Sequence, residues 1–274
     1  MNDIQQVLFN MLCDIDDFCT KHDIPYYLVY GTTLGAVRHQ GFIPWDDDID
    51  IAMTAENYAR FLELASKEPI GNSPDLYFIQ TQDSDPHFQC TWTKIRRNQT
   101  AYITRGDAPF EGHLGLWIDV FPFYPAAKTR AGRKLQLFES KAAYILAISE
   151  DKCKKPYRII RRMLFPVFGQ KRLIRFLMRR ACRPRKEGPL LFLVGDYFFS
   201  TAFIEARHFG QPDFLPFEGR NFPCPTDSDG YLTAVYGDYH RIPSPDEIVT
   251  HDALFSSIDH SYTEFVDQAK KAGV

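Results

Sequence analysis

The segment that most constrains the fold is residues 46–53, where acidic and apolar residues alternate within a short run. Side chains of a β-strand point alternately to its two faces, so every second residue here shares a face. The acids of one face are Asp46, Asp48 and Asp50, if the strand begins that early. The other face, pointing into a core, carries Ile49, Ile51 and Met53. Carboxylates about 7 Å apart along a strand can converge on one hard cation, and without it their repulsion is costly.

A further acid, Asp119, stands between Ile118 and Val120 in a strand expected over residues 115–121. An acid in an apolar strand needs a partner. Magnesium uses one or two carboxylates, and a second metal would need an acid from a neighbouring strand. We therefore expect Mg²⁺ or Mn²⁺ here, with catalytic roles for Asp48, Asp50 and Asp119. The expected metal ligands are Asp46, Asp48, Asp50 and Asp119.

The acidic run has two other interpretations, an EF-hand loop and a solvated acidic turn. An EF-hand loop that began at Asp46 would need Gly at its sixth position and Glu at its twelfth, where this chain has Ile51 and Asn57. A solvated acidic turn is common, but it does not account for the upstream Gly-Thr turn or for the Asp119 strand.

Periodicity and turn residues predict an α/β (α+β) fold with a small mixed sheet. Helices are expected over 2–21, 32–39, 54–67 and 129–150, and strands over 26–30, 48–53, 76–82, 88–104 and 115–121, the last ended by Pro122. Residues 76–82 and 88–104 are assigned to one sheet. Residues 152–186 read as one or two amphipathic helices broken near Pro166 and Gly169, and residues 187–250 as an irregular wrap. We expect a catalytic core over 1–125 and a helical, irregular elaboration over 126–274.

Several residues near these acids are candidates for substrate binding. Gly31 would let a phosphate approach the backbone, and Thr32 and Thr33 would supply donors at a helix N-terminus. Arg38 can contact phosphate or pair with an acid. The further candidates are Trp45, Lys94, Arg96 and His113. Lys94 and Arg96 share a strand face and either neutralise a diphosphate or are solvated. His113 is an acid/base candidate or a surface histidine, and Trp45 belongs to an aromatic cage for a quaternary ammonium or to the core.

The run LVYGTTLGAVRHQGFIPWDDDIDIAM resembles the signature of the LicD family, which includes bacterial phosphorylcholine transferases and, more distantly, fukutin-related protein. The segments WTKIRR, LWIDVFPFY and YLTAVYGDYHRIP match more weakly and in the same order. The resemblance implies a nucleotidyltransferase-like core, with Asp48 and Asp50 at the positions of the family's metal-binding acids and Asp119 at that of its third acid.

The same resemblance implies transfer of a phospho-alcohol, with phosphocholine first, from a CDP-linked donor to a sugar of a surface glycan such as teichoic acid, lipopolysaccharide or a capsule precursor. Choline, ribitol and glycerol are all compatible with these residues. The alternatives are nucleotide transfer from an NTP to a small hydroxylated acceptor, and a non-catalytic membrane-associated adaptor.

Charge is segregated along the chain, although its net charge is only −3. Residues 152–186 hold 14 Lys or Arg and no acid, so the remainder carries 18 basic against 35 acidic residues, a balance of −17. This stretch predicts an anionic partner, a membrane surface or lipid-linked glycan in preference to nucleic acid. Without a signal peptide or transmembrane run, and with six cysteines that form no CxxC pair, the chain is expected in the cytoplasm, at or near the inner face of its membrane.

Overall fold

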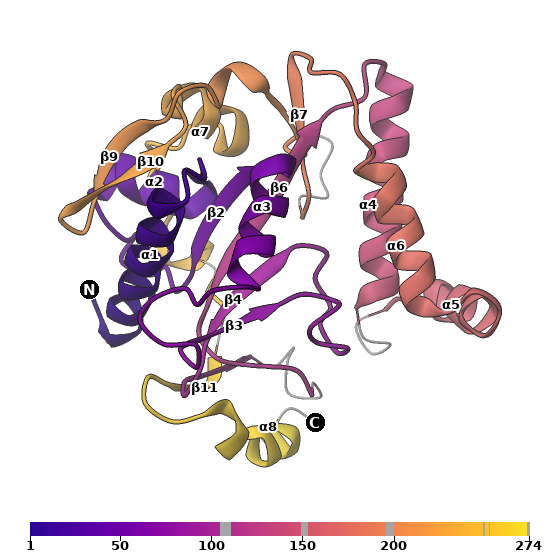
Figure 1. Cartoon of the computed structure of the whole chain (residues 1–274), viewed down its shortest axis with the longest axis horizontal. Coiled ribbons are helices and arrows are strands. Elements are labelled where there is room, and N and C mark those ends of the chain that lie inside the picture. The colour runs from indigo at the N-terminus through magenta and orange to yellow at the C-terminus, as the bar shows by residue number, and fades with distance from the viewer. Residues whose placement is uncertain (105–110, 149–152, 196–199, 249, 252, 273–274) are drawn as a thin grey trace.

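The structure, a computed structural model, describes residues 1–104, 111–148, 153–195, 200–248, 250–251 and 253–272 (Figure 1). Its α-helices are α1 (Asp3–Lys21), α2 (Tyr30–His39), α3 (Ala55–Ala65), α4 (Arg130–Ala147), α5 (Lys155–Phe168), α6 (Gln170–Ala181), α7 (Ser228–Tyr236) and α8 (Val266–Ala272). Its strands are β1 (Tyr27–Leu28), β2 (Ile49–Thr54), β3 (Tyr77–Gln80), β4 (Thr93–Arg97), β5 (Ala101–Thr104), β6 (Trp117–Pro125), β7 (Leu190–Leu193), β8 (Phe203–Glu205), β9 (Asp213–Phe217), β10 (Arg220–Cys224) and β11 (Ala253–Ser257).

A seven-stranded mixed sheet organises the chain, in the order β1-β2-β6-β4-β3, with β7 extending from β6 and β8 from β7. The β2–β6 pair is parallel, and the other pairs of this sheet are antiparallel. The long strand β6 is therefore flanked by β2 on one side and by β4, then β7, on the other. The expected α/β class with a small mixed sheet is confirmed.

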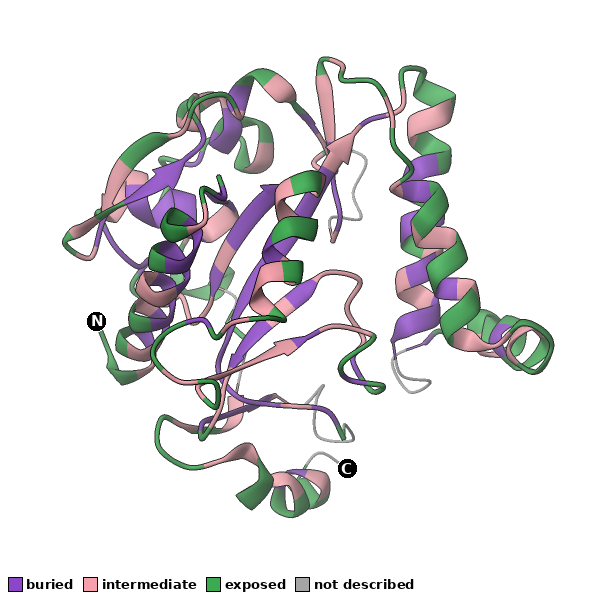
Figure 2. Ribbon diagram, viewed as in Figure 1, coloured by how far each residue is buried: buried purple, intermediate pink, exposed green. Residues whose placement is uncertain are grey.

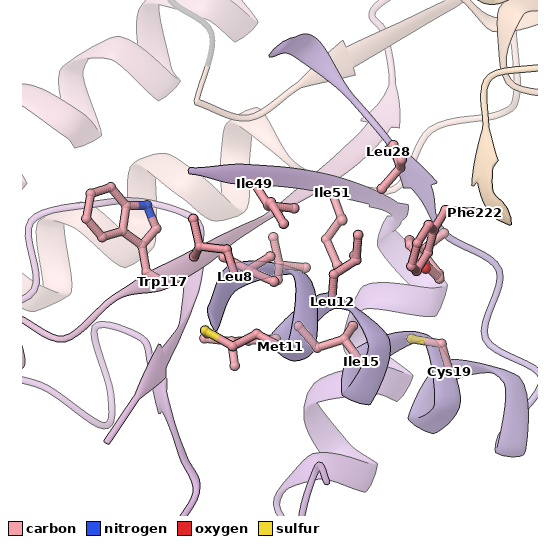
Figure 3. Packing of buried hydrophobic residues seen from close by; sticks show 14 of the residues in the cluster. Leu8, Met11, Leu12, Ile15, Cys19, Leu28, Ile49, Ile51, Trp117 and Phe222 are labelled. Atoms are coloured by element: carbon pink, nitrogen blue, oxygen red, sulfur yellow. The ribbon is translucent and has the colours of Figure 1, made fainter. Parts of the chain in front are cut away.

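The two faces of β2 pack against different parts of the fold. Ile49, Ile51 and Met53 are fully buried against α1 and α3, as the alternating pattern predicts, and Figure 3 shows the first two packed on the apolar side of α1. The opposite face of β2 and β6 packs against α2 and α7 through a second cluster that includes Ala52 and Phe121. Because side chains alternate, Asp50 and Asp119 belong to this second face.

Helices α4, α5 and α6 form an arm beside the sheet (Figure 1). Helices α4 and α6 pack along each other, and α5 lies across their far end, where Figure 2 shows it largely exposed. Gln136 donates to the Ala181 carbonyl, and the Arg180 guanidinium pairs with Glu139 at 2.5 Å, so polar contacts fix α4 against α6. None of the helices in the described ranges has the length and apolar character needed to cross a bilayer.

Of two predicted breaks at prolines, one is wrong and one is confirmed at the neighbouring glycine. Strand β6 continues through Pro122, because this residue lies between the last β4 partner, Val120, and the first β7 partner, Phe123, where no ladder donor is needed on that side. The predicted break near Pro166 and Gly169 occurs at Gly169, whose φ is 73° and which separates α5 from α6. Pro166 itself stays within α5, where it removes one backbone donor.

Residues 187–250 are more regular than expected, since they contain β7, β8, α7 and the β9–β10 hairpin. Pro216 and Pro223 occur within that hairpin, where both strands are edges and tolerate a missing donor. Strand β5 also differs from expectation, because it pairs with β11 in a separate two-stranded sheet. The structure describes the expected helix over 129–150 only to residue 148, and Lys152 of the basic stretch lies outside the described residues. The division at residue 125 stays a prediction.

Candidate active site

The strand register of the mixed sheet places Asp119 between an acid and a base. Asp119 is opposite Asp50 in the parallel β2–β6 pair and opposite Lys94 in the antiparallel β4–β6 pair. Residues opposite each other in neighbouring strands project from the same face, so all three side chains meet there. This face therefore gathers groups that are 25 to 69 residues apart in the sequence.

Asp48, in the loop before β2, lies close to Asp50 and Asp119. One carboxylate oxygen each from Asp48, Asp50 and Asp119 lie within 4.8 Å of one another. Strand β2 begins at Ile49, so Asp46 and Asp48 precede the strand and do not alternate along it as the sequence suggested. The loop nevertheless turns Asp48 toward Asp50 and Asp119. Three oxygen donors this close suit a hard divalent cation such as Mg²⁺.

Asp119 is held by three donors. The Lys94 ammonium lies 2.8 Å from Asp119 Oδ2, the Trp117 indole N–H donates to the same oxygen at 2.8 Å, and the Trp92 indole N–H donates to Oδ1. The Lys94 ammonium also lies 4.2 Å from the Trp117 ring centre. These contacts fix the carboxylate and supply one positive charge to an acidic site.

A second acidic cluster adjoins the first. Asp47 accepts a hydrogen bond from Tyr102, and Asp47 Oδ1 lies 2.6 Å from His251 Nδ1. His251 Nε2 lies 3.7 Å from Asp48 Oδ2, so this histidine connects the two clusters. Sequence reasoning did not find His251, which is 203 residues beyond Asp48 and lies in no motif that we recognised.

The Gly-Thr turn supports the acids directly. Thr32 Oγ1 accepts the Asp50 backbone N–H at 2.9 Å, so this buried side chain fixes Asp50 against the start of α2. Thr33 donates instead to the Leu28 carbonyl at 2.6 Å, so its hydroxyl hydrogen is engaged within the fold. A Cβ atom on Gly31 would lie 3.0 Å from Asp46 Oδ2. The absence of a side chain at Gly31 therefore gives Asp46 its place beside the helix.

The described contacts of the remaining candidates are with other parts of the fold. Arg38 donates to the Tyr239 carbonyl at 2.9 Å. Arg96 is buried and not solvated; it donates to Gln80 at 2.8 Å and to the Gly115 carbonyl at 2.7 Å. Trp45 packs against the second apolar cluster.

His113 is likewise occupied by packing. Its ring stacks on Phe78 with centroids 5.2 Å apart and lies 2.8 Å from the side-chain oxygen of Asn98. Burial, with the nearby Arg96 charge, lowers the pKa of His113 to about 4, so the ring is neutral near pH 7. The described contacts of the His113 ring are with Phe78, Asn98, Tyr262 and the Gly115 backbone N–H, not with the acidic clusters.

Burial and the neighbouring negative charges raise the pKa values of three acids. Burial and the Asp48 and Asp47 charges raise the pKa of Asp46 to about 7. Burial raises the pKa of Asp48 to about 6, with the His251 charge opposing and the Asp119 charge adding to this shift. Burial and the charges of Asp48 and Asp119 raise the pKa of Asp50 well above its usual range. The uncompensated charge of this cluster is what a divalent cation would neutralise.

Asp47 behaves differently from its neighbours. Burial alone would raise its pKa, but hydrogen bonds from His251 and Tyr102 outweigh burial and lower it. The same hydrogen bond raises the pKa of His251, against the effect of burial. Asp47 and His251 thus form an ion pair beside the acids, and Asp47 is already satisfied without a metal.

The region that holds the acidic strands is similar to a known protein family. Residues 23–147 match the family described as LicD/FKTN/FKRP, nucleotidyltransferase domain. The chain is 27% identical over 264 residues to the lipopolysaccharide cholinephosphotransferase LicD of Haemophilus influenzae, across 90% of this chain and 94% of that relative. An uncharacterized protein of Rickettsia typhi is 44% identical over 57 residues, 21% of this chain and 18% of the relative. One of Rickettsia prowazekii is 48% identical over 50 residues, 18% of this chain and 19% of the relative. Both acidic strands lie within the matched residues 23–147, and His251 lies beyond them.

Proposed function

The chain carries a LicD-family domain, and from that premise we propose that it is a transferase of phosphorus-containing groups. The group transferred is a phospho-alcohol, with phosphocholine first, moved from a CDP-linked donor to a sugar hydroxyl of a cell-surface glycan. The similarity to a lipopolysaccharide cholinephosphotransferase over 94% of that protein supports this choice. The observation that carries the proposal is the convergence of Asp48, Asp50 and Asp119 within 4.8 Å.

We propose that a divalent cation, Mg²⁺ or Mn²⁺, is bound by these three carboxylates. The donor set fits it: the acids supply only oxygen ligands, and their crowding leaves charge that the neighbouring cations do not cancel. When bound, the cation would neutralise phosphate charge and act as a Lewis acid toward it.

The reaction would exchange one phosphorus–oxygen bond for another. The acceptor hydroxyl oxygen bonds to the phosphorus that carries the alcohol, the bond from that phosphorus to CMP breaks, and the hydroxyl proton leaves to a base or to water. Such transfers depend mainly on positioning and on electrostatic stabilisation. Here Lys94 supplies positive charge at Asp119, and Thr32 positions Asp50 by accepting its backbone N–H.

The substrate class is tested by calorimetric binding of CDP-choline, CDP-ribitol, CDP-glycerol and CTP in the presence of magnesium. The proposal predicts binding of one CDP-alcohol that is lost in Asp48→Asn/Asp50→Asn. The control is Asp75→Asn, since Asp75 is exposed and its described hydrogen bonds are made by its own backbone N–H and carbonyl. Binding of CTP alone would favour nucleotide transfer, and no binding of any of the four would favour a non-catalytic adaptor.

A further inference from the structure

Helix α5 exposes an apolar stripe to solvent. Ile159, Met163 and Val167 are 62%, 68% and 72% exposed, and Ile160 beside them is 47% exposed. At about 100° per residue these four side chains fall within one arc of about 100°. Scattered exposed apolar residues are ordinary, but a continuous stripe on one helix marks an interaction surface.

The stripe is a fixed part of the fold. Arg161, on the opposite side of α5, is buried and donates to the Ile148 carbonyl at 2.6 Å and to Cys153 Sγ at 3.0 Å. Phe165, also on that side, joins the cluster between α4 and α6. These contacts hold α5 at the end of the arm (Figure 1), and the stripe on the other side of the helix is exposed.

Positive charge borders this stripe along one side of α5. Residues 152–186 contain 14 Lys or Arg and no acid. On α5, Lys155, Arg158 and Arg162 lie on the arc next to the stripe, and the exposed cations at the start of α6 are Lys171 and Arg172. The surface therefore combines an apolar strip with a cationic border, which is the composition of a helix that lies in a membrane interface.

We propose that α5 and the start of α6 form a docking surface for an anionic lipid bilayer. The apolar stripe would enter the headgroup boundary, and the bordering cations would contact lipid phosphates. A second copy of this chain fits less well, because it would bring two sets of cations together. Nucleic acid would use the cations but leave the stripe in water. This inference does not depend on the proposed transfer reaction.

The test is co-sedimentation of the full chain with vesicles of phosphatidylcholine alone and of phosphatidylcholine mixed with phosphatidylglycerol. We expect binding to the anionic vesicles to be about tenfold or more tighter, and to weaken in high salt. Two variants should each reduce this binding by about tenfold or more: Ile159→Ser/Met163→Ser/Val167→Ser, and Lys155→Gln/Lys171→Gln/Arg172→Gln. The matched control is Phe214→Ser/Ile242→Ser, which replaces side chains that are 64% and 63% exposed outside the arm.

Equal recovery with neutral and anionic vesicles would overturn the proposal, as would wild-type binding by the triple serine variant. Light scattering tests whether a second copy of the chain covers the surface instead. A dimer that forms with the wild type but not with the triple serine variant would assign the surface to that second copy. Thermal melting checks that each variant is folded. CMP release with a water-soluble acceptor, measured without vesicles, reports the transfer reaction separately, so failure of either proposal is visible without the other.

Discussion

Asp50 and Asp119 lie directly opposite each other on the parallel strands β2 and β6, on the face of the sheet away from α1. Opposed like charges in neighbouring strands destabilise a sheet, and here Asp48 adds a third carboxylate. Lys94 offsets only part of this charge. The fold therefore maintains an arrangement that is unfavourable without a cation, which is the physical basis of the proposed metal site.

Removing one acid should stabilise the metal-free protein. The pKa of Asp48 is raised from 3.8 to about 6, so its ionised form is disfavoured in the folded state. Near pH 8 we expect Asp48→Asn to raise the free energy of unfolding by about 2 kcal/mol in chelator, while activity falls about 100-fold or more. Urea unfolding measures the free energy of unfolding, and CMP release measures the activity. Asp75→Asn should change neither, and a loss of metal-free stability in Asp48→Asn would contradict the account.

Stability should depend on pH in a direction set by these acids. Asp46 and Asp48 have folded-state pKa values of about 7 and about 6, above the 3.8 of an ordinary aspartate. The folded protein then binds more protons than the unfolded chain between these values, so their contribution to stability is lost as pH rises from about 4 to 7.

Magnesium binds the ionised acids, so it should raise the melting temperature strongly at pH 8 and only slightly at pH 5. The measurement is melting with MgCl₂ against NaCl of equal ionic strength. An equal magnesium effect at both pH values, or one retained in Asp48→Asn/Asp50→Asn, would rule out these carboxylates as the site.

Lys94 should contribute through its pairing with Asp119. Both side chains are largely buried, so Lys94→Met leaves an acid without its cation and should cost about 3 kcal/mol in the metal-free protein. The double variant Lys94→Met/Asp119→Asn should recover part of this loss. The exposed pair of Lys21 with Glu68 is the control, and Lys21→Met should cost less than about 1 kcal/mol. Equal losses in the single and double variants would show that the pair is not coupled.

Gly31→Ala should impair activity without unfolding the protein. Gly31 lies within α2, where alanine is favoured by about 1 kcal/mol, but its Cβ would lie 3.0 Å from Asp46 Oδ2. We expect Asp46 to be displaced and CMP release to fall about tenfold or more, with the melting temperature nearly unchanged. Gly188→Ala is the matched control, because no atom lies within 4 Å of its Cβ position. Full activity in Gly31→Ala would remove Asp46 from the site.

Local patterns predicted the parts of the structure that depend on neighbouring residues. The alternation of residues 49–53 correctly placed Ile49, Ile51 and Met53 in the core, because strand geometry alone determines it. The order of strands is a property of the whole fold, so the sequence could nominate Asp119 but not its register opposite Asp50 and Lys94.

The failures have similar causes. His251 contacts Asp47 because the segment before β11 packs beside the loop before β2. No local sequence pattern predicts this long-range contact. His113 and Arg96 had the residue types of a phosphate site, but tertiary packing uses them for Phe78, Gln80 and the Gly115 carbonyl. Pro122 suggested the end of a strand, but β6 continues past it between its β4 and β7 partners. Residues 187–250 were expected to be irregular, but the β9–β10 hairpin forms there with Pro216 and Pro223 in its two edge strands.

The most direct test of the central claim is product analysis with CDP-choline, magnesium and a glycan acceptor. The account predicts equal amounts of CMP and phosphocholine-bearing glycan, formed by the wild type and by Asp75→Asn but not by Asp48→Asn/Asp50→Asn. If choline is the wrong alcohol, CDP-ribitol or CDP-glycerol should give the same acid-dependent pattern. Pyrophosphate from an NTP, with no CMP from any CDP-alcohol, would contradict phospho-alcohol transfer.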